Sequence, residues 1–166
     1  MTAPTHPPLS GGCLCGRVRY RIEGQASFTS QCCCRDCQKA TGTGHTTIVG
    51  IRRSQLEITG DPKTFTNIGE SGGGVTRHFC GECGGRIYTS GQLPGEFVMV
   101  QAGSLDDPNV IEPENVIYAK DAVRWDRFDA ALPVFERLPP REFLPEGGPA
   151  PAKAALPAGE PARQES

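Results

Sequence analysis

The sequence lacks several features that would place it in large functional classes. It has no uninterrupted apolar run of about 18 residues, which argues against a membrane-spanning helix. Its net charge is −2, so it has no positive excess for binding nucleic acid. The opening MTAPTHPPLSGG has neither a charged start nor an apolar stretch, so we expect no secretory signal. These absences favour a cytoplasmic protein that binds neither nucleic acid nor membrane.

The composition favours one mostly β domain with many turns. The 166 residues are 37% hydrophobic and contain 21 Gly and 15 Pro, which disfavours a helical bundle. Alternating or β-branched patterns predict strands at 18–22, 46–51, 56–58, 97–100 and 116–118. A short helix is predicted from Cys34 to Thr41, ended by Gly42. We therefore expect an antiparallel sheet with one short helical segment.

The two ends of the chain differ from its middle. Residues 1–9 form a polar, Pro-containing arm, which we expect to be flexible. The ordered domain is predicted over residues 10–138. Residues 139–166 are rich in Pro and Ala and contain too little apolar surface to offset the entropy of ordering, so we predict a disordered tail.

Eight cysteines are the most informative residues. They form three local clusters, C-x-C at 13–15, C-C-C-x-x-C at 32–37 and C-x-x-C at 80–83. Without an export signal, clustered cysteines more often bind metal or perform chemistry than form disulfides. A disulfide-stapled domain remains the alternative.

The Cys80-Gly-Glu-Cys83-Gly-Gly segment is typical of a zinc knuckle, which supplies only two ligands. Cys13 and Cys15 are the natural second pair, because residues two apart in an extended segment point to the same side. These four cysteines predict a closed structural zinc site.

The middle cluster offers three converging sulfurs. Cys32 and Cys34 share one side of an extended segment, and Cys37 lies one helical turn after Cys34. Three ligands leave one position open, as in catalytic zinc sites. Three thiolates with Zn²⁺ sum to −1, which favours binding and deprotonating a thiol over activating water. Alternatives are a second structural site completed by Cys33, or redox thiols without metal.

Three segments resemble the glutathione-dependent formaldehyde-activating enzyme family, whose domain is shared with centromere protein V. They are GGCLCG at 11–16, CCCRDCQKATG at 32–42 and GVTRHFCGECGG at 74–85. Weaker similarity includes Ile117-Tyr118 and residues 120–125, ahead of Asp129 and Leu132-Pro133. The resemblance covers residues 10–138. Members often carry His between the first two cysteines of the second cluster, where this chain has Cys33.

The resemblance implies an Mss4-like fold with two zinc ions per chain. It implies a structural zinc on Cys13, Cys15, Cys80 and Cys83, and a more labile catalytic zinc on Cys32, Cys34 and Cys37. It also implies a carbon–sulfur lyase reaction in which glutathione, as co-substrate, and formaldehyde form S-hydroxymethylglutathione. The implied partner is a small thiol–aldehyde adduct.

Other residues are candidates for supporting roles. An anionic thiol needs cations at its entry, for which the candidates are Arg35, Lys39, Arg77 and Arg124. His45 and His78 are candidate acids or bases, and Trp125 is expected to pack in the core or at its rim.

Two other functions stay open at this point, a non-catalytic zinc module that binds a partner protein and a thiol redox or metal buffer. Equally tight metal sites would favour the first alternative, and variable metal content with oxidant-dependent disulfides would favour the second.

Overall fold

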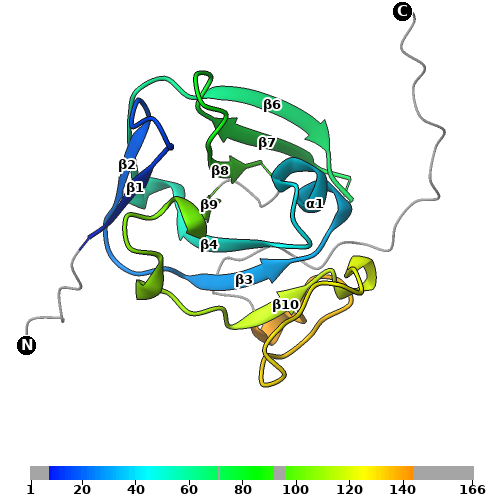
Figure 1. Cartoon of the computed structure of the whole chain (residues 1–166). Helices are drawn as coiled ribbons and strands as arrows, with labels where there is room; N and C mark the ends of the chain where they lie inside the picture. Colours follow the sequence, from blue (N-terminus) through cyan, green and yellow to red (C-terminus); the bar gives the residue numbers. More distant parts are fainter. Residues whose placement is uncertain (1–7, 71, 92–95, 144–166) are drawn as a thin grey trace, which may run out of the picture.

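The computed structural model describes residues 8–70, 72–91 and 96–143. Most of the predicted arm and most of the predicted tail lie outside these residues. Two sheets and one α-helix make up the fold, as Figure 1 shows. The predicted mostly β architecture is confirmed.

The smaller sheet has the strand order β1-β2-β5 and is antiparallel throughout. Its strands are β1 (Leu9–Gly12), β2 (Arg19–Ile22) and β5 (Leu56–Thr59). Tyr20 and Ile22 of β2 are buried whereas Arg19 and Arg21 are exposed, so the alternation in the sequence does mark a half-buried strand.

The larger sheet has the order β10-β3-β4-β9-β8-β7-β6. Its strands are β3 (Phe28–Cys32), β4 (Thr46–Arg52), β6 (Lys63–Ile68), β7 (Gly74–Phe79), β8 (Arg86–Ser90), β9 (Phe97–Gln101) and β10 (Asn115–Ile117). All neighbours are antiparallel except β10 and β3, which run parallel. The sheet is therefore mixed, with one parallel pair at its edge.

The helix α1 (Arg35–Thr41) follows β3 after two residues. Cys34 is its N-cap, and Gly42 ends it in the left-handed conformation with φ of 75°. Only a residue without a Cβ adopts that conformation at no steric cost, which is why the helix stops there. In Figure 1, α1 lies between the β6–β7 end of the large sheet and its β3 end. The Asp36 side chain accepts a hydrogen bond from Asn67 of β6 (2.9 Å), and Gln38 donates to the carbonyl of Asp121 (2.8 Å).

Short 3-10 helices occupy several connections. They span Arg53–Gln55, Ala102–Ser104, Pro108–Val110, Ala119–Asp121 and Arg141–Phe143.

The two faces of the large sheet have different surroundings. On β4, Val49 and Ile51 are fully buried in the main core together with residues of the small sheet. Ile48, one residue away and on the opposite face, belongs to a second apolar cluster that contains Cys32 and Met99. This second face is where the candidate site lies.

Candidate functional site

Four cysteines from two distant loops meet at one end of the molecule. Cys13 and Cys15 lie between β1 and β2, and Cys80 and Cys83 lie between β7 and β8. Their sulfur atoms all lie within 4.8 Å of one another. Cys15 Sγ is 3.6 Å from Cys13 Sγ and 3.7 Å from Cys80 Sγ. The four thiols can therefore surround one metal ion.

The backbone of the second loop is shaped for this arrangement. The Gly84 N–H donates to the Cys80 carbonyl, and the Cys80 N–H donates to the Gly85 carbonyl, both at 2.9 Å. Gly84 has φ of +71°, a value that disfavours other residues. Burial raises the pKa of Cys13, but hydrogen bonds from the Val18 N–H and the neighbouring thiols outweigh it and lower that pKa to about 6. Cys13 thus favours the thiolate form. A backbone hydrogen bond from Arg17 lowers the pKa of Cys15, but burial and the bonds to the other thiols outweigh it and raise that pKa to about 12.

A second group of three cysteines lies where β3 passes into α1. Cys32 ends β3, Cys34 caps the helix and Cys37 lies in its first turn. Their sulfur atoms also lie within 4.8 Å of one another, and no fourth Cys, His, Asp or Glu of the described residues joins the group. Cys33 is fully buried outside it, and its N–H donates to the Ile117 carbonyl (3.0 Å).

The three thiols change one another's pKa values. Hydrogen bonds from Cys32 and Cys37 lower the pKa of Cys34 to about 3, and the Cys37 N–H adds a bond to the same sulfur (3.4 Å). The hydrogen bond with Cys34 raises the pKa of Cys32 in turn. A cluster of thiolates repels itself unless a cation lies between them, so this donor set suits a thiophilic metal ion. Either cluster could hold one.

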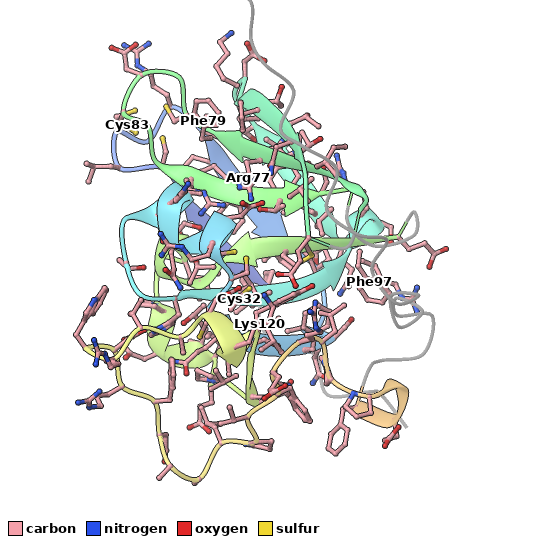
Figure 2. All side chains as sticks on the ribbon, turned by 90° about the vertical axis from the view of Figure 1, so that its right-hand side faces the viewer. Cys32, Arg77, Phe79, Cys83, Phe97 and Lys120 are labelled. Atoms are coloured by element: carbon pink, nitrogen blue, oxygen red, sulfur yellow. The ribbon has the colours of Figure 1, made fainter. Side chains whose placement is uncertain are left out.

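A cavity of about 280 Å³ lies beside the second cluster. Cys32, Cys34 and Cys37 all line it, whereas none of the other four clustered cysteines does. The rest of the lining is mixed: apolar residues of the second cluster form part of it, and polar residues such as Ser30, Thr89 and Gln101 form another part. Figure 2 shows Cys32 near the middle of the molecule, below Arg77, and Cys83 at its upper edge. The two clusters are thus separate sites with different access.

Arg86 is a cavity residue that the sequence reasoning missed. The pairing of β7 with β8 matches His78 with Tyr88 and then Phe79 with Arg86, so Ile87 is skipped as a bulge. The bulge turns Arg86 onto the face that Arg77 occupies, and both line the cavity. Burial lowers the pKa of Arg86, while the charges of Cys37 and Cys34 raise it. Arg86 therefore lies within electrostatic reach of two of the three sulfurs.

Of the four cations proposed from the sequence, only Arg77 lines the cavity. Arg77 is buried (8% exposed) and lies 3.5 Å from Asp36, and its Nε has no hydrogen-bond partner. Arg35 instead hydrogen-bonds Gln38 on its own helix. Lys39 and Arg124 do not line the cavity either.

The other sequence candidates lie elsewhere. His45 Nδ1 is 2.5 Å from an Asp126 carboxylate oxygen, and His78 stacks on Tyr88 and hydrogen-bonds Ser90 (2.9 Å). Neither histidine lines the cavity. Trp125 was expected in the core or at its rim; it is 70% exposed, so it does not lie in the core.

Two further cavity residues were assigned no role from the sequence. Tyr118 has φ of 54°, a left-handed conformation that is unusual for an aromatic residue. Asn115 is buried at the parallel β10–β3 pair. Both positions depend on a long-range strand pairing that local sequence does not reveal.

Comparison with known proteins identifies the family. The sequence matches the glutathione-dependent formaldehyde-activating enzyme family over residues 8–121, more than half of the chain. The chain belongs to this family. All eight cysteines fall within the matched residues. Comparison with curated protein sequences gave no match.

Among solved structures, a Rhodobacter sphaeroides protein determined by structural genomics is similar, with 19% identity and a TM-score of 0.48. The similarity covers 63% of this chain and 96% of that one. Within the described residues, no helix is both long and apolar enough to cross a membrane.

Proposed function

We propose that this member of the family is a zinc-dependent carbon–sulfur lyase-type enzyme that joins a thiol to an aldehyde and splits the adduct again. Glutathione and formaldehyde, giving S-hydroxymethylglutathione, are the first pair to test because the family is named for them. One observation carries the proposal. Three sulfurs converge on the wall of a cavity, and no fourth ligand among the described residues closes the group.

The metal we propose for both clusters is zinc, which thiolates bind tightly and which has no redox chemistry of its own. Cys13, Cys15, Cys80 and Cys83 would hold the structural ion, and Cys32, Cys34 and Cys37 the catalytic one. Zinc keeps a thiol bound at its open position deprotonated. The net charge of −1 on such a site makes it a poor activator of water, so hydrolysis is not the reaction we propose.

The proposed reaction forms a carbon–sulfur bond and leaves a negative charge on oxygen that the cavity must stabilise. The thiolate sulfur attacks the aldehyde carbon, the carbon–sulfur bond forms and the carbonyl π electrons move to oxygen. The resulting alkoxide takes a proton from water, which balances the proton that the thiol lost. Arg86 is the group we assign to stabilise the alkoxide, because it lines the same cavity as the three sulfurs and its buried Nη1 has no hydrogen-bond partner. A cation that the protein holds in position stabilises such a charge without the reorganisation that water would need.

The test follows adduct formation from glutathione and formaldehyde by NMR exchange spectroscopy. The zinc-loaded protein is expected to accelerate exchange above the protein-free rate. Replacement of Arg86 by Gln should lower kcat roughly 100-fold with a smaller change in KM, because the lost interaction is strongest in the transition state. Arg124→Gln is the matched control, since Arg124 is exposed and lies outside the cavity lining. The proposal is refuted if the zinc-loaded wild-type protein accelerates exchange neither with this pair nor with another thiol and aldehyde.

A further inference from the structure

A second cavity, of about 330 Å³, adjoins the first at the end away from the sulfurs. We call it the β3–β10 pocket, because the starts of β3 and β10 line it together with parts of residues 133–143. Phe28, Asn115 and Phe143 line both cavities. The strands β3 and β10 run side by side (Figure 1), so the pocket lies along the same edge of the sheet as the sulfur of Cys32.

The register of the two strands gives the distance from the sulfurs to this pocket. Phe28 is four positions before Cys32 on β3, which is roughly 13 Å at about 3.3 Å per residue. Asn115 of β10 pairs with Ser30, two positions before Cys32, which is roughly 7 Å by the same measure. A thiol held at the three sulfurs and extended along β3 therefore reaches the β3–β10 pocket with its far end.

Two carboxylates line the β3–β10 pocket, and its described lining contains no cation. The Thr29 N–H donates to Glu114 Oε2 (2.9 Å), which positions the first carboxylate. Glu142 supplies the second. Neither glutamate forms an ion pair with a described side chain. The pocket thus carries negative charge that the described part of the chain does not neutralise.

A buried amide in the same pocket also lacks a partner. Asn115 is 8% exposed, and its Oδ1, which can only accept a hydrogen bond, has no partner. A buried acceptor left unpaired is costly, so the group that completes it must be a donor. Phe135 and Phe143, with ring centroids 5.3 Å apart, add aromatic faces to the pocket lining. An ammonium group carries positive charge and three N–H donors, and aromatic faces attract it.

The sulfur end of the first cavity has the opposite charge. Arg77 and Arg86 both line it, and Arg77 Nε and Arg86 Nη1 are buried without hydrogen-bond partners. The charges of Cys37 and Cys34 act on Arg86, which places it near the sulfurs. The two ends together match a zwitterionic thiol, with an anionic group near its sulfur and a cationic group at its far end.

We propose that Glu114, Glu142 and Asn115 form a subsite for an ammonium group at the far end of the thiol substrate. The inference rests on the proposed function and specifies one part of its substrate. Glutathione, for which the family is named, fits this subsite. Its ammonium group lies about 10 Å from its sulfur when the molecule is extended, at the chain reach of roughly 3.3–3.6 Å for every three backbone bonds.

The test compares two thiols that differ only in the ammonium group. Glutathione and glutaryl-cysteinylglycine, which has hydrogen in place of that group, are titrated into the full-length zinc-loaded protein by isothermal titration calorimetry. Both probes keep the thiol and both carboxylates. We expect glutathione to bind about fivefold more tightly, because only glutathione offers a charged donor to the carboxylates and to the Asn115 amide.

A pair of substitutions locates the effect in the β3–β10 pocket. Glu114→Gln together with Glu142→Gln removes both charges and keeps an acceptor for the Thr29 N–H. This double variant should lower the ratio of the two affinities to twofold or less, through weaker binding of glutathione alone. Glu112→Gln together with Glu136→Gln is the matched control, because both residues are exposed and line neither cavity.

The outcomes separate this inference from the proposed function. Equal binding of the two thiols, or tighter binding of the analogue, would overturn the ammonium subsite and leave the thiol site intact. A preference for glutathione that survives the double substitution would also overturn it, because the ammonium group would then bind elsewhere. Failure of both thiols to bind would overturn the thiol site and this inference together. Thermal melts and zinc analysis check that each variant is folded and loaded.

Discussion

The two cysteine clusters use the same ligand atom but are built differently. Cys15 and Cys80 are 65 positions apart in the sequence, so the four-cysteine cluster joins two loops that nothing local holds together. The three-cysteine cluster comes from six consecutive positions at one strand–helix junction, which hydrogen bonds already fix. Metal at the first cluster therefore closes a long loop, whereas metal at the second is added to a segment that the fold has already shaped.

The two cysteine clusters also differ in their position relative to the cavity. The four-cysteine cluster offers four ligands, and none of its cysteines lines the 280 Å³ cavity. Every member of the three-cysteine cluster lines that cavity. A fourth thiolate would seal the second site. On this ground we propose that the four-cysteine cluster stabilises the fold and that the three-cysteine cluster binds a ligand.

The largest expected effect comes from breaking each cluster in turn. Replacement of Cys80 by Ser should unfold the domain at 25 °C, because metal binding at a closed four-cysteine site contributes about 10–16 kcal/mol in peptide models, as much as the whole stability of a typical domain. Cys34→Ser should leave a folded domain with one metal ion fewer. Circular dichroism and metal analysis of both variants make the comparison, and equal loss of structure in the two would show that both sites are structural.

A smaller effect is expected from removing metal without mutation. Brief treatment with EDTA should remove one of two zinc ions, since the three-cysteine site has an open position that a chelator reaches through the cavity. The melting temperature should change little, because the β3–α1 junction keeps its hydrogen bonds. Native mass spectrometry counts the ions. Simultaneous loss of both, with unfolding, would contradict the division of roles.

Local chemistry in the sequence was sufficient for some elements. Gly42 marks the end of α1, and the Val18–Ile22 alternation marks β2, because each signal depends only on neighbouring residues. The grouping of Cys13 and Cys15 with Cys80 and Cys83 follows from ligand counting, since each pair alone is incomplete. Their metal-binding role remains a prediction.

Elements that depend on long-range strand pairing could not be predicted from local sequence signals. The β3 segment, Phe28–Cys32, has no clear alternation, and its parallel pairing with β10 depends on residues more than 80 positions away. Arg86 reaches the cavity only because a bulge shifts the register of two strands. The cavity is the sum of such pairings, so its lining could not be read from the cysteine spacing that located the sulfurs.

The smallest effect concerns a polar contact that supports the four-cysteine end without metal. Asp106 accepts hydrogen bonds from Arg19 (2.8 and 2.5 Å) and from Ser10 (2.6 Å), which joins β1 and β2 to the segment after the 3-10 helix Ala102–Ser104. The bond from Arg19 holds the pKa of Asp106 at about 2, below its usual 3.8. A carboxyl group whose pKa is lower in the folded than in the unfolded protein stabilises the fold at pH values above its unfolded pKa. This stabilisation is lost as the pH falls through the folded pKa.

Asp106→Asn should therefore lower the melting temperature by about 2 °C between pH 7 and pH 4, with the difference from wild type shrinking below pH 4. Asp61→Asn is the matched control, because Asp61 is 89% exposed and forms its ion pair with the exposed side chain of Lys63. Melting curves of the three proteins at a series of pH values provide the test. If Asp106→Asn destabilised the protein as much as Cys80→Ser, this polar contact, rather than the four sulfurs, would hold the first hairpin against the domain. The proposed structural role of the four-cysteine cluster would then be wrong.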